Sequence, residues 1–347
     1  MLEDGCYYIE DTTYCCKISF SEISFVEPDA FFTENCVVLA KGSYKNEQFY
    51  LEEVYQPPLH ANKAMMFKIN EQDYFGSYTR MTEALRQNRL EGSFNETVKL
   101  PPTVEESNYD PCIVIVNQIE IDQARQYNAI KSLFQGLESM KPEMLVLVGK
   151  FISNENNESA THEQLRDHFE QLGSVVRDLD LEFLRDKTQW VLIPSMDDPG
   201  IMKLMPNFKL SEYLVASMKG NGPKRIKNVT LATNPCRISF MGKEIVICRY
   251  NYYKKLKKNH LARFQVQQDE QTKTDEVRTP DTFKIAKTVL NQGYLIPLPM
   301  IVQPIIWSFG DSLSLYPHPN FLVLADECED YFYQVPVNGH KTTFHDA

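Results

Sequence analysis

The sequence predicts two structural classes in one chain: a strand-rich region at the start and a layered α/β sandwich in the remainder. Three observations support this division. Short runs of aromatic and β-branched residues dominate the first hundred residues. From Cys112 on, continuous apolar runs alternate with stretches of helical period, and later runs are typical of paired strands. At 347 residues, the chain also exceeds one average domain, which favours two unequal domains.

The composition favours a folded protein and excludes several functional classes. Hydrophobic residues make up 43% of the chain and aromatic residues 12%, enough for substantial cores. The net charge of −11 disfavours a general nucleic-acid coat. The eight cysteines form no C-x-x-C pair, so no zinc knuckle is expected. The acidic start lacks the apolar segment of a signal peptide, and prolines interrupt the longest apolar run, so we expect a soluble protein of a reducing compartment.

Four strands are predicted in the first sixty residues. They are Cys6–Glu10, Tyr14–Phe20, Cys36–Tyr44 and Gln48–Tyr55. Lys45-Asn46 separates the last two, which therefore read as a hairpin, and Pro57-Pro58 stops the final strand. Several short strands with little helix indicate a small barrel or sandwich. Residues 62–110 are expected to form a linker with some helix near Thr82–Arg89.

A small barrel suggests two roles for its aromatic residues. They could stack on the bases of single-stranded DNA, as in OB-folds, or they could be core and partner-facing residues. The residues in question are Tyr7, Phe20, Phe49 and Tyr50. The region carries more acidic than basic residues, and this favours the second role.

The alternating region begins with two apolar strands and a helix between them. Cys112–Val116 is a continuous apolar run, as expected for a strand buried on both faces, and Met144–Gly149 is another. Asp122 is the expected N-cap of the helix, and Pro142 ends it. The apolar residues at helical spacing are Tyr127, Ile130, Leu133, Phe134, Leu137 and Met140.

Further helices and strands follow in the predicted sandwich. Thr161 and Gln164 form a capping box for a second helix, with more helix to about Leu184. The later elements are a strand at Trp190–Ile193, a helix from Ser211 to Gly220, strands at Asn228–Thr233, Cys236–Phe240 and Glu244–Tyr250 with Gly242 in a hairpin turn, a helix from Thr279-Pro280 to Gly293, and a buried strand at Phe321–Asp326.

Polar residues follow four of these strands, at the position where α/β sheets place their functional groups. The four loops are Asn117–Glu120, Gly149–Phe151, Ser195–Asp198 and Ala325–Cys328. We expect them to converge on one edge. A two-metal hydrolase would need Asp, His and Asn there, but none of the four loops contains histidine. The loops supply only carboxylates, so weak binding of Mg²⁺ or Ca²⁺ is one alternative and turn capping by Asp197 and Asp198 is the favoured one.

Two other segments carry candidate chemistry. Cys236 would need a nearby base to act as a nucleophile, and a buried structural thiol is favoured. The segment Arg249–Phe264 contains six Lys or Arg residues and no acid, with tyrosines between them. It is either a contact to nucleic-acid phosphates or a solvated connection. Its candidate contact residues are Lys254, Lys255, Lys257 and Lys258.

Several motifs, in a consistent order, resemble the B subunits of the DNA polymerases alpha, delta and epsilon, and the epsilon branch most closely. The motifs are VLIPSMDDPG, TNPCRI, LVLVGKFIS, NQGYLIPLP and HPNFLVLADECEDY, together with YIEDTTYCCKISFSE and FFTENCVVLAKGSYKNEQF near the start. The resemblance implies an OB-fold barrel in residues 1–105, including a linker, packed on a calcineurin-like phosphoesterase sandwich in residues 106–347.

The resemblance also implies that the phosphoesterase site is inactive. Gln118 and Glu120 align with the Asp and His of the first metal motif, and Lys150 with the Asp of the second. The remaining degenerate positions are Met196 and Asp197 in the third motif and Asp326 and Cys328 in the Gly-His-x-His motif. A cation at position 150 replaces a metal-bridging carboxylate. No catalytic residue, no metal ligand and no cofactor is therefore expected.

The function implied is that of a non-catalytic accessory subunit in nuclear DNA replication and repair. Its expected partners are the catalytic subunit of polymerase epsilon, through the zinc domain at that subunit's C-terminus, and other small polymerase and replisome subunits, with DNA as an open alternative and no membrane. The family usually has a helical domain before the OB-fold and further sequence after the last buried strand, so a fragment or a shortened subunit is expected. The rival functions are a metal-dependent phosphoesterase or nuclease and an autonomous single-stranded DNA binder.

Overall fold

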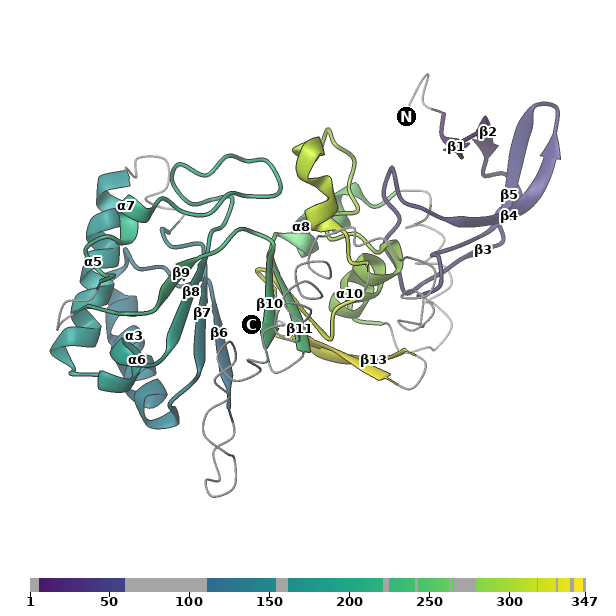
Figure 1. Ribbon diagram of the computed structural model, residues 1–347. Coiled ribbons are helices and arrows are strands. Elements are labelled where there is room, and N and C mark those ends of the chain that lie inside the picture. The colour runs from purple at the N-terminus through teal and green to yellow at the C-terminus, as the bar shows by residue number, and fades with distance from the viewer. Residues whose placement is uncertain are drawn as a thin grey trace, which may run out of the picture.

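A computed structural model describes residues 6–59, 111–153, 162–220, 225–240, 243–261, 264, 279–316, 318–328, 330–337 and 340–345. The predicted linker and its helix near Thr82–Arg89, the capping residue Thr161 and the turn residue Gly242 lie outside these ranges. Within them the chain is a mixed α/β protein with three sheets (Figure 1). None of the helices in the described ranges has the length and apolarity needed to cross a membrane.

The N-terminal strands form one sheet around a central strand. The sheet contains β1 (Tyr8–Glu10), β2 (Cys15–Ser19), β3 (Phe25–Val26), β4 (Leu39–Lys45) and β5 (Gln48–Tyr55). β2 and β3 both pair with β5 in parallel, and β4 pairs with it antiparallel, which confirms the predicted hairpin. The turn residues Asn46 and Glu47 have φ of 52° and 61°, the left-handed backbone typical of tight hairpins. The described strands do not close into a barrel.

A parallel sheet with helices follows. It has the order β6-β7-β8-β9 and comprises β6 (Ile113–Asn117), β7 (Met144–Val148), β8 (Gln189–Ile193) and β9 (Val229–Leu231). The helices described in this part are α3 (Ala124–Met140), α5 (His162–Asp178), α6 (Glu182–Asp186) and α7 (Glu212–Val215). They pack their apolar residues on one face of the sheet, where Phe134 and Trp190 meet edge to face at 5.4 Å.

The last sheet is mixed and has the order β10-β11-β12-β14-β13. Its strands are β10 (Cys236–Phe240), β11 (Lys243–Arg249), β12 (Phe321–Ala325), β13 (Phe332–Val337) and β14 (His340–His345). The helices of this part are α8 (Tyr252–Asn259), α10 (Asp281–Gln292) and the 3₁₀ helix η1 (Trp307–Leu313). α10 ends at Gly293, whose φ of 60° provides the predicted left-handed C-cap.

The sheet β6-β7-β8-β9 and the sheet β10-β11-β12-β14-β13 pack face to face between layers of helix (Figure 1). Val146, Val191, Ile247 and Val323 belong to the core between the sheets. The outer face of the first sheet packs on α3 and α5, and the outer face of the second packs on α8 and α10. The result is a four-layer α/β/β/α sandwich, which orients the carboxyl ends of β6, β7, β8 and β12 toward a common edge.

The N-terminal sheet is anchored to the helical layer that contains α8 and α10. Phe32 N donates to Nδ1 of His260 at 3.0 Å, and Thr33 Oγ1 donates to the Pro297 carbonyl at 2.7 Å. Lys287 on α10 forms an ion pair with Glu27 at 2.5 Å. Phe264 is buried in the small core of the N-terminal sheet. These contacts join the first sixty residues to the sandwich.

Several local predictions were wrong, each for an identifiable reason. Asp122 does not cap α3. Its carboxylate accepts hydrogen bonds from the backbone N–H and the hydroxyl of Ser153, at 3.0 and 2.7 Å. β6 is half-buried, because it is the edge strand of its sheet. Met140 is exposed at the end of α3, and the helix expected from Ser211 to Gly220 is a single turn, α7. Thr279 Oγ1 donates to Asp29 and does not cap α10.

Candidate functional site

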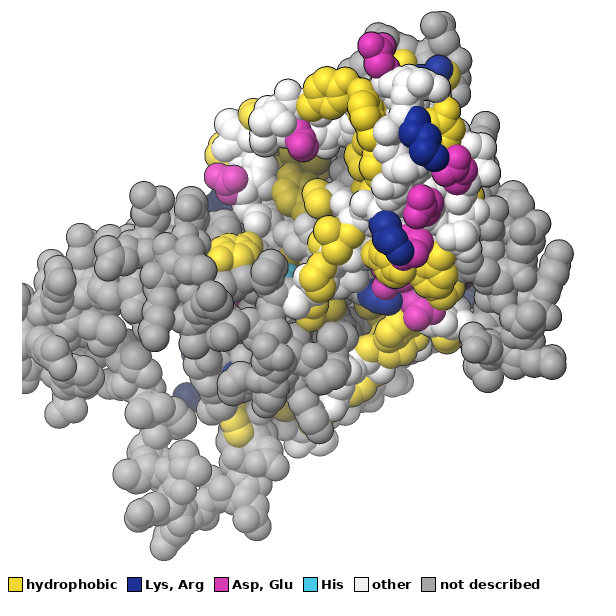
Figure 2. Space-filling view, turned by 90° about the vertical axis from the view of Figure 1, so that its right-hand side faces the viewer, with side chains coloured by type: hydrophobic (Ala, Val, Ile, Leu, Met, Phe, Trp, Pro, Cys, Tyr) yellow, Lys and Arg dark blue, Asp and Glu magenta, His cyan; other side chains and the backbone are white. Residues whose placement is uncertain are grey.

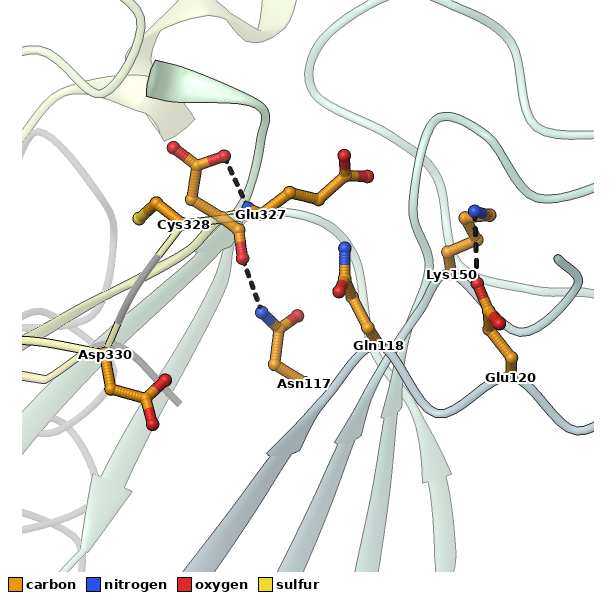
Figure 3. Close-up of a pocket in the computed structure, with 8 residues that line it drawn as sticks. Asn117, Gln118, Glu120, Lys150, Glu327, Cys328 and Asp330 are labelled. Atoms are coloured by element: carbon orange, nitrogen blue, oxygen red, sulfur yellow. Dashed lines mark hydrogen bonds and ion pairs between the residues drawn. The ribbon is translucent and has the colours of Figure 1, made fainter. Parts of the chain in front are cut away.

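A polar pocket lies at the edge of the sandwich where β6, β7 and β12 end. Its volume is about 460 Å³. The lining residues are Asn117, Gln118, Glu120, Lys150, Asp326, Glu327, Cys328 and Asp330. Figure 3 shows the first two loops facing the last one across this space, with Gln118 directed toward Glu327. The predicted convergence of these three loops is therefore confirmed.

The third predicted loop approaches the edge without lining the pocket. Met196 packs against the apolar cluster of α8 and α10. Asp198 is fully enclosed, and its two carboxylate oxygens accept hydrogen bonds from Phe151 N at 2.6 Å and Ser195 N at 2.8 Å. A hydrogen bond from Phe151 to Asp198 thus joins the loop after β7 to the loop after β8.

Gly149 occupies the junction between these two loops. A Cβ atom at this position would overlap Oδ2 of Asp198 and would lie 2.8 Å from Ser195 N. Glycine is therefore required there for the close approach of two backbones. Burial raises the pKa of Asp198 to about 6, against the lowering effect of the two backbone hydrogen bonds.

Lys150 contributes a buried cation to the wall of the pocket. Its side chain is 4% exposed, and Nζ lies 3.2 Å from Oε1 of Glu120, which is 20% exposed (Figure 3). The Glu120 carboxylate therefore forms an internal ion pair with Lys150. Because removing either partner would leave an unpaired charge in a poorly solvated place, the pair is expected to persist.

Arg249 supplies a second buried cation, at the carboxyl end of β11. Its guanidinium donates from Nε to the Gly149 carbonyl at 3.0 Å and from Nη1 to the Ala325 carbonyl at 3.1 Å. Nη2 forms an ion pair with Glu327 at 3.1 Å, and Nη1 also reaches Asn251 at 3.0 Å. With a side chain only 1% exposed, Arg249 ties the loop after β7 to the loop after β12, and so joins the two sheets.

The last loop is held by further polar contacts. Asp326 accepts hydrogen bonds from Tyr253 N at 2.6 Å and Glu327 N at 2.7 Å, and burial raises the pKa of its carboxyl group. Burial also acts to raise the pKa of Glu327, but Lys254 and Arg249 outweigh it and the pKa is lowered. Asn117 donates to the Asp326 carbonyl at 2.9 Å across the pocket.

The arrangement is poorly suited to metal catalysis. A two-metal site needs several anionic or neutral ligands free to converge on ions about 3.5–4 Å apart. Glu120 and Glu327 are instead paired with Lys150 and Arg249, and Asp198 is occupied by backbone N–H groups. The described part of the chain contains no cluster of three or more His, Cys, Asp or Glu residues arranged to hold a metal ion.

The basic segment forms α8 and its flanks, and its lysines differ in their surroundings. Lys254 pairs with Glu327 at 2.6 Å, and Lys257 pairs with Asp281 at 3.0 Å. Lys258 is exposed, and Lys255 is half-buried. The tyrosines at the start of the segment, Tyr250 and Tyr252, are buried in the core and cannot stack on bases.

Arg249 is the important site residue that sequence reasoning did not single out. The sequence places it both in the predicted strand Glu244–Tyr250 and at the start of the basic segment, and the structure makes it the last residue of β11. Its one local signal is a charged residue directly after the apolar run Ile245–Cys248. An arginine that ends a buried strand must find internal partners. Cys236, in contrast, is buried as expected, and burial raises the pKa of its thiol to about 11.

Comparison with known proteins identifies relatives across almost the entire chain. DNA polymerase epsilon subunit 2 of Drosophila melanogaster is 28% identical over 331 residues, which cover 95% of this chain and 56% of the relative. The DNA polymerase epsilon B subunit of Arabidopsis thaliana is 30% identical over 333 residues, with 94% and 57% covered. DNA polymerase epsilon subunit 2 of Homo sapiens is 25% identical over 333 residues, with 95% and 56% covered. The chain thus spans little more than half the length of these curated relatives.

Two family models match separate parts of the chain. An OB-fold domain of the DNA polymerase epsilon subunit 2-like type matches residues 1–58, so the N-terminal sheet is part of an OB-fold domain. The DNA polymerase alpha/epsilon B-subunit family matches residues 113–333, which cover most of the sandwich. The predicted resemblance to the epsilon branch is confirmed, and the chain belongs to the DNA polymerase alpha/epsilon B-subunit family.

Proposed function

We propose that this chain is a non-catalytic accessory subunit of DNA polymerase epsilon that scaffolds the catalytic subunit in chromosomal DNA replication and repair. Family membership and the names of the relatives support the assignment. The observation that carries the non-catalytic part is the pair of internal cations, Lys150 and Arg249, at the edge of the sandwich. A protein whose candidate site is filled by its own ion pairs is better suited to holding partners than to hydrolysis.

We also propose the finer architecture, with an OB-fold domain and linker in residues 1–105 and a calcineurin-like phosphoesterase domain in residues 106–347. The four-layer sandwich and the convergence of its loops at one edge support this division. In the proposal the degenerate motif positions are Gln118, Glu120, Lys150, Met196, Asp197, Asp326 and Cys328.

The proposed partner is the catalytic subunit of polymerase epsilon, held through its C-terminal zinc domain, together with the small subunits of the same complex in the nucleus. Permanent interfaces of this kind are large and have apolar centres. The described surface carries exposed large apolar side chains that are compatible with such an interface, among them Tyr14, Val37 and Leu39 in the N-terminal region.

Charge on the N-terminal sheet does not favour the rival role of an autonomous single-stranded DNA binder. Lys41 pairs with Glu53 at 2.6 Å, and Lys45 lies 3.8 Å from Glu22. Figure 2 shows this side of the molecule, where dark blue basic side chains alternate with magenta acidic ones between yellow apolar ones. A surface with balanced charges lacks the continuous basic groove that tracks a nucleic-acid backbone.

Co-expression with the catalytic subunit of polymerase epsilon from the same organism tests the proposal. We expect the two chains to elute together in size-exclusion chromatography, and we expect deletion of the C-terminal zinc domain of the catalytic subunit to separate them. The catalytic subunit of polymerase delta is the specificity control and should elute apart from this chain. Separate elution of intact polymerase epsilon and this chain, or equal binding of both catalytic subunits, would contradict the proposal.

A further inference from the structure

Two loops that run along the upper edge of the molecule in Figure 1 carry exposed apolar side chains. One loop spans residues 200–209, after β8, and the other spans residues 299–313 and includes η1. We call this surface the apolar shelf; its members are Met202, Phe208, Met300, Ile301, Trp307 and Phe309. Trp307 is 81% exposed and Ile301 is 90% exposed. Single exposed apolar residues are common, whereas a contiguous group marks an interaction site.

Direct contacts make the two loops one surface. The rings of Phe208 and Phe309 meet edge to face at 5.9 Å. Met205 and Ile305 form a parallel bridge, and Ile306 N donates to the Met205 carbonyl at 2.8 Å. The two segments are therefore hydrogen-bonded to each other along their backbones.

A buried asparagine keeps the first loop rigid. Asn207 Nδ2 donates to the carbonyl oxygens of Leu204 at 2.7 Å and Met202 at 3.2 Å. Its backbone N–H donates to the Asn234 carbonyl at 2.7 Å. A surface ordered in this way loses little conformational entropy on binding, which favours association.

The shelf contains a small pit of about 100 Å³. Its lining residues are Gly200, Ile201, Met202, Leu204, Pro206, Asn207, Phe208, Lys209 and Ile306. Pockets for small-molecule ligands usually measure about 300–1,000 Å³. This pit has the volume of about three water molecules at ~30 Å³ each, and so it suits one aliphatic side chain. A protein segment with an apolar anchor is the matching occupant.

Two exposed cations lie on the first loop of the shelf. Lys209 lines the pit, and Lys203 follows the lining residue Met202 in the chain and forms no ion pair with any residue in the described ranges. Glu212 lies 3.5 Å from Lys209 but is shared with Lys219 at 3.4 Å. The local excess of positive charge favours a carboxylate next to the anchor.

We propose that the apolar shelf docks an amphipathic, acidic segment of another protein, with an aliphatic side chain in the pit and a carboxylate against Lys203 and Lys209. Trp and Met are enriched at interfaces, and Trp is among the residues that most often dominate binding energy. The proposal goes beyond the scaffolding of the catalytic subunit, because it assigns a separate surface and a partner chemistry.

Trp307 gives the proposal a direct spectroscopic test. The chain has two tryptophans, and the other, Trp190, is buried. The probe is a short helical peptide with leucines on one face and glutamates on the other, and a second peptide has every glutamate changed to lysine. We expect the glutamate peptide to bind the full chain and shift the Trp307 emission to shorter wavelength, and we expect W307F to remove the shift.

Variants then locate the contact. Met202→Ser and Phe208→Ser are each expected to weaken binding of the glutamate peptide by about ten-fold or more. Met140→Ser, at the exposed end of α3, is the matched control and should bind as the wild type does. Equal binding of the lysine peptide, absence of binding, insensitivity to both shelf variants, or a shift caused only by self-association of the chain would each overturn the proposal.

Discussion

Replacing Arg249 with leucine is expected to lower the free energy of unfolding by about 3–5 kcal/mol. The guanidinium is almost completely buried and bonds to Gly149, Ala325 and Glu327. Leucine would leave two backbone carbonyls without their donor and would leave Glu327 without its internal partner. Urea denaturation followed by circular dichroism measures the change.

Arg166→Leu is the matched control, because it makes the same change on the exposed side of α5. Arg166 is 35% exposed, pairs with Asp167 at 2.9 Å and contacts Tyr213, all at the surface, so its loss should cost much less stability than the loss of Arg249. R249K retains the charge but lacks the planar guanidinium that donates to several acceptors at once. Its free energy of unfolding should therefore lie between those of the wild type and R249L. If R249L were no less stable than R166L, Arg249 would not stabilise the contact between the two sheets.

The stability of the wild type relative to Asp198→Asn is expected to fall by about 2 kcal/mol as the pH rises from about 4 to about 6. Burial raises the pKa of Asp198 to about 6 in the folded state, from an ordinary value of 3.8. Across this range, the unfolded chain releases the Asp198 proton while the folded chain retains it, so a rise in pH favours unfolding. The magnitude follows from ~1.4 kcal/mol per pKa unit.

The asparagine variant isolates this effect because it cannot titrate. It should also lose a constant amount of stability, since an amide can accept from only one of the two N–H groups that the carboxylate serves. Asp186→Asn provides a control of opposite sign: hydrogen bonding to Arg185 lowers the pKa of Asp186, so the wild type should gain relative stability as the pH rises. Denaturant midpoints measured at intervals from about pH 2.5 to about pH 7 give both curves, because the gain for Asp186 falls mainly below its ordinary pKa of 3.8. If the stability of the wild type minus that of D198N stayed constant or rose with pH, the raised pKa of Asp198 would be refuted.

The strands of the sandwich were predictable because their burial leaves a pattern in the sequence. Met144–Val148, Gln189–Ile193 and Phe321–Ala325 are continuous apolar runs with polar residues at their ends. Parallel strands place their carboxyl ends at one edge, and this brought Asn117, Lys150 and Asp326 together as expected. Fold and location of the site thus followed from local sequence and general topology.

The partners of the polar residues could not be predicted in the same way. A carboxylate at a helix start has the same chemistry whether it caps that helix or bonds to a distant loop, and Asp122 bonds to Ser153. Lys150 pairs with Glu120, and Arg249 bonds to Gly149, with no fixed sequence spacing between partners. Such pairs depend on how the layers stack, and the spacing of apolar residues in the sequence does not determine this. The sequence therefore predicted where the polar loops converge without revealing which ion pairs they form.

Manganese binding, measured by anomalous X-ray diffraction from crystals soaked in MnCl₂, tests the central claim most directly. The claim is that Lys150 and Arg249 occupy the edge of the sandwich as permanent internal cations. The predicted result is an anomalous map without peaks among the loops after β6, β7, β8 and β12, and both ion pairs intact. Two manganese peaks about 3.5–4 Å apart in this pocket, with Glu120 or Asp326 as ligands, would contradict the claim and restore the hydrolase alternative.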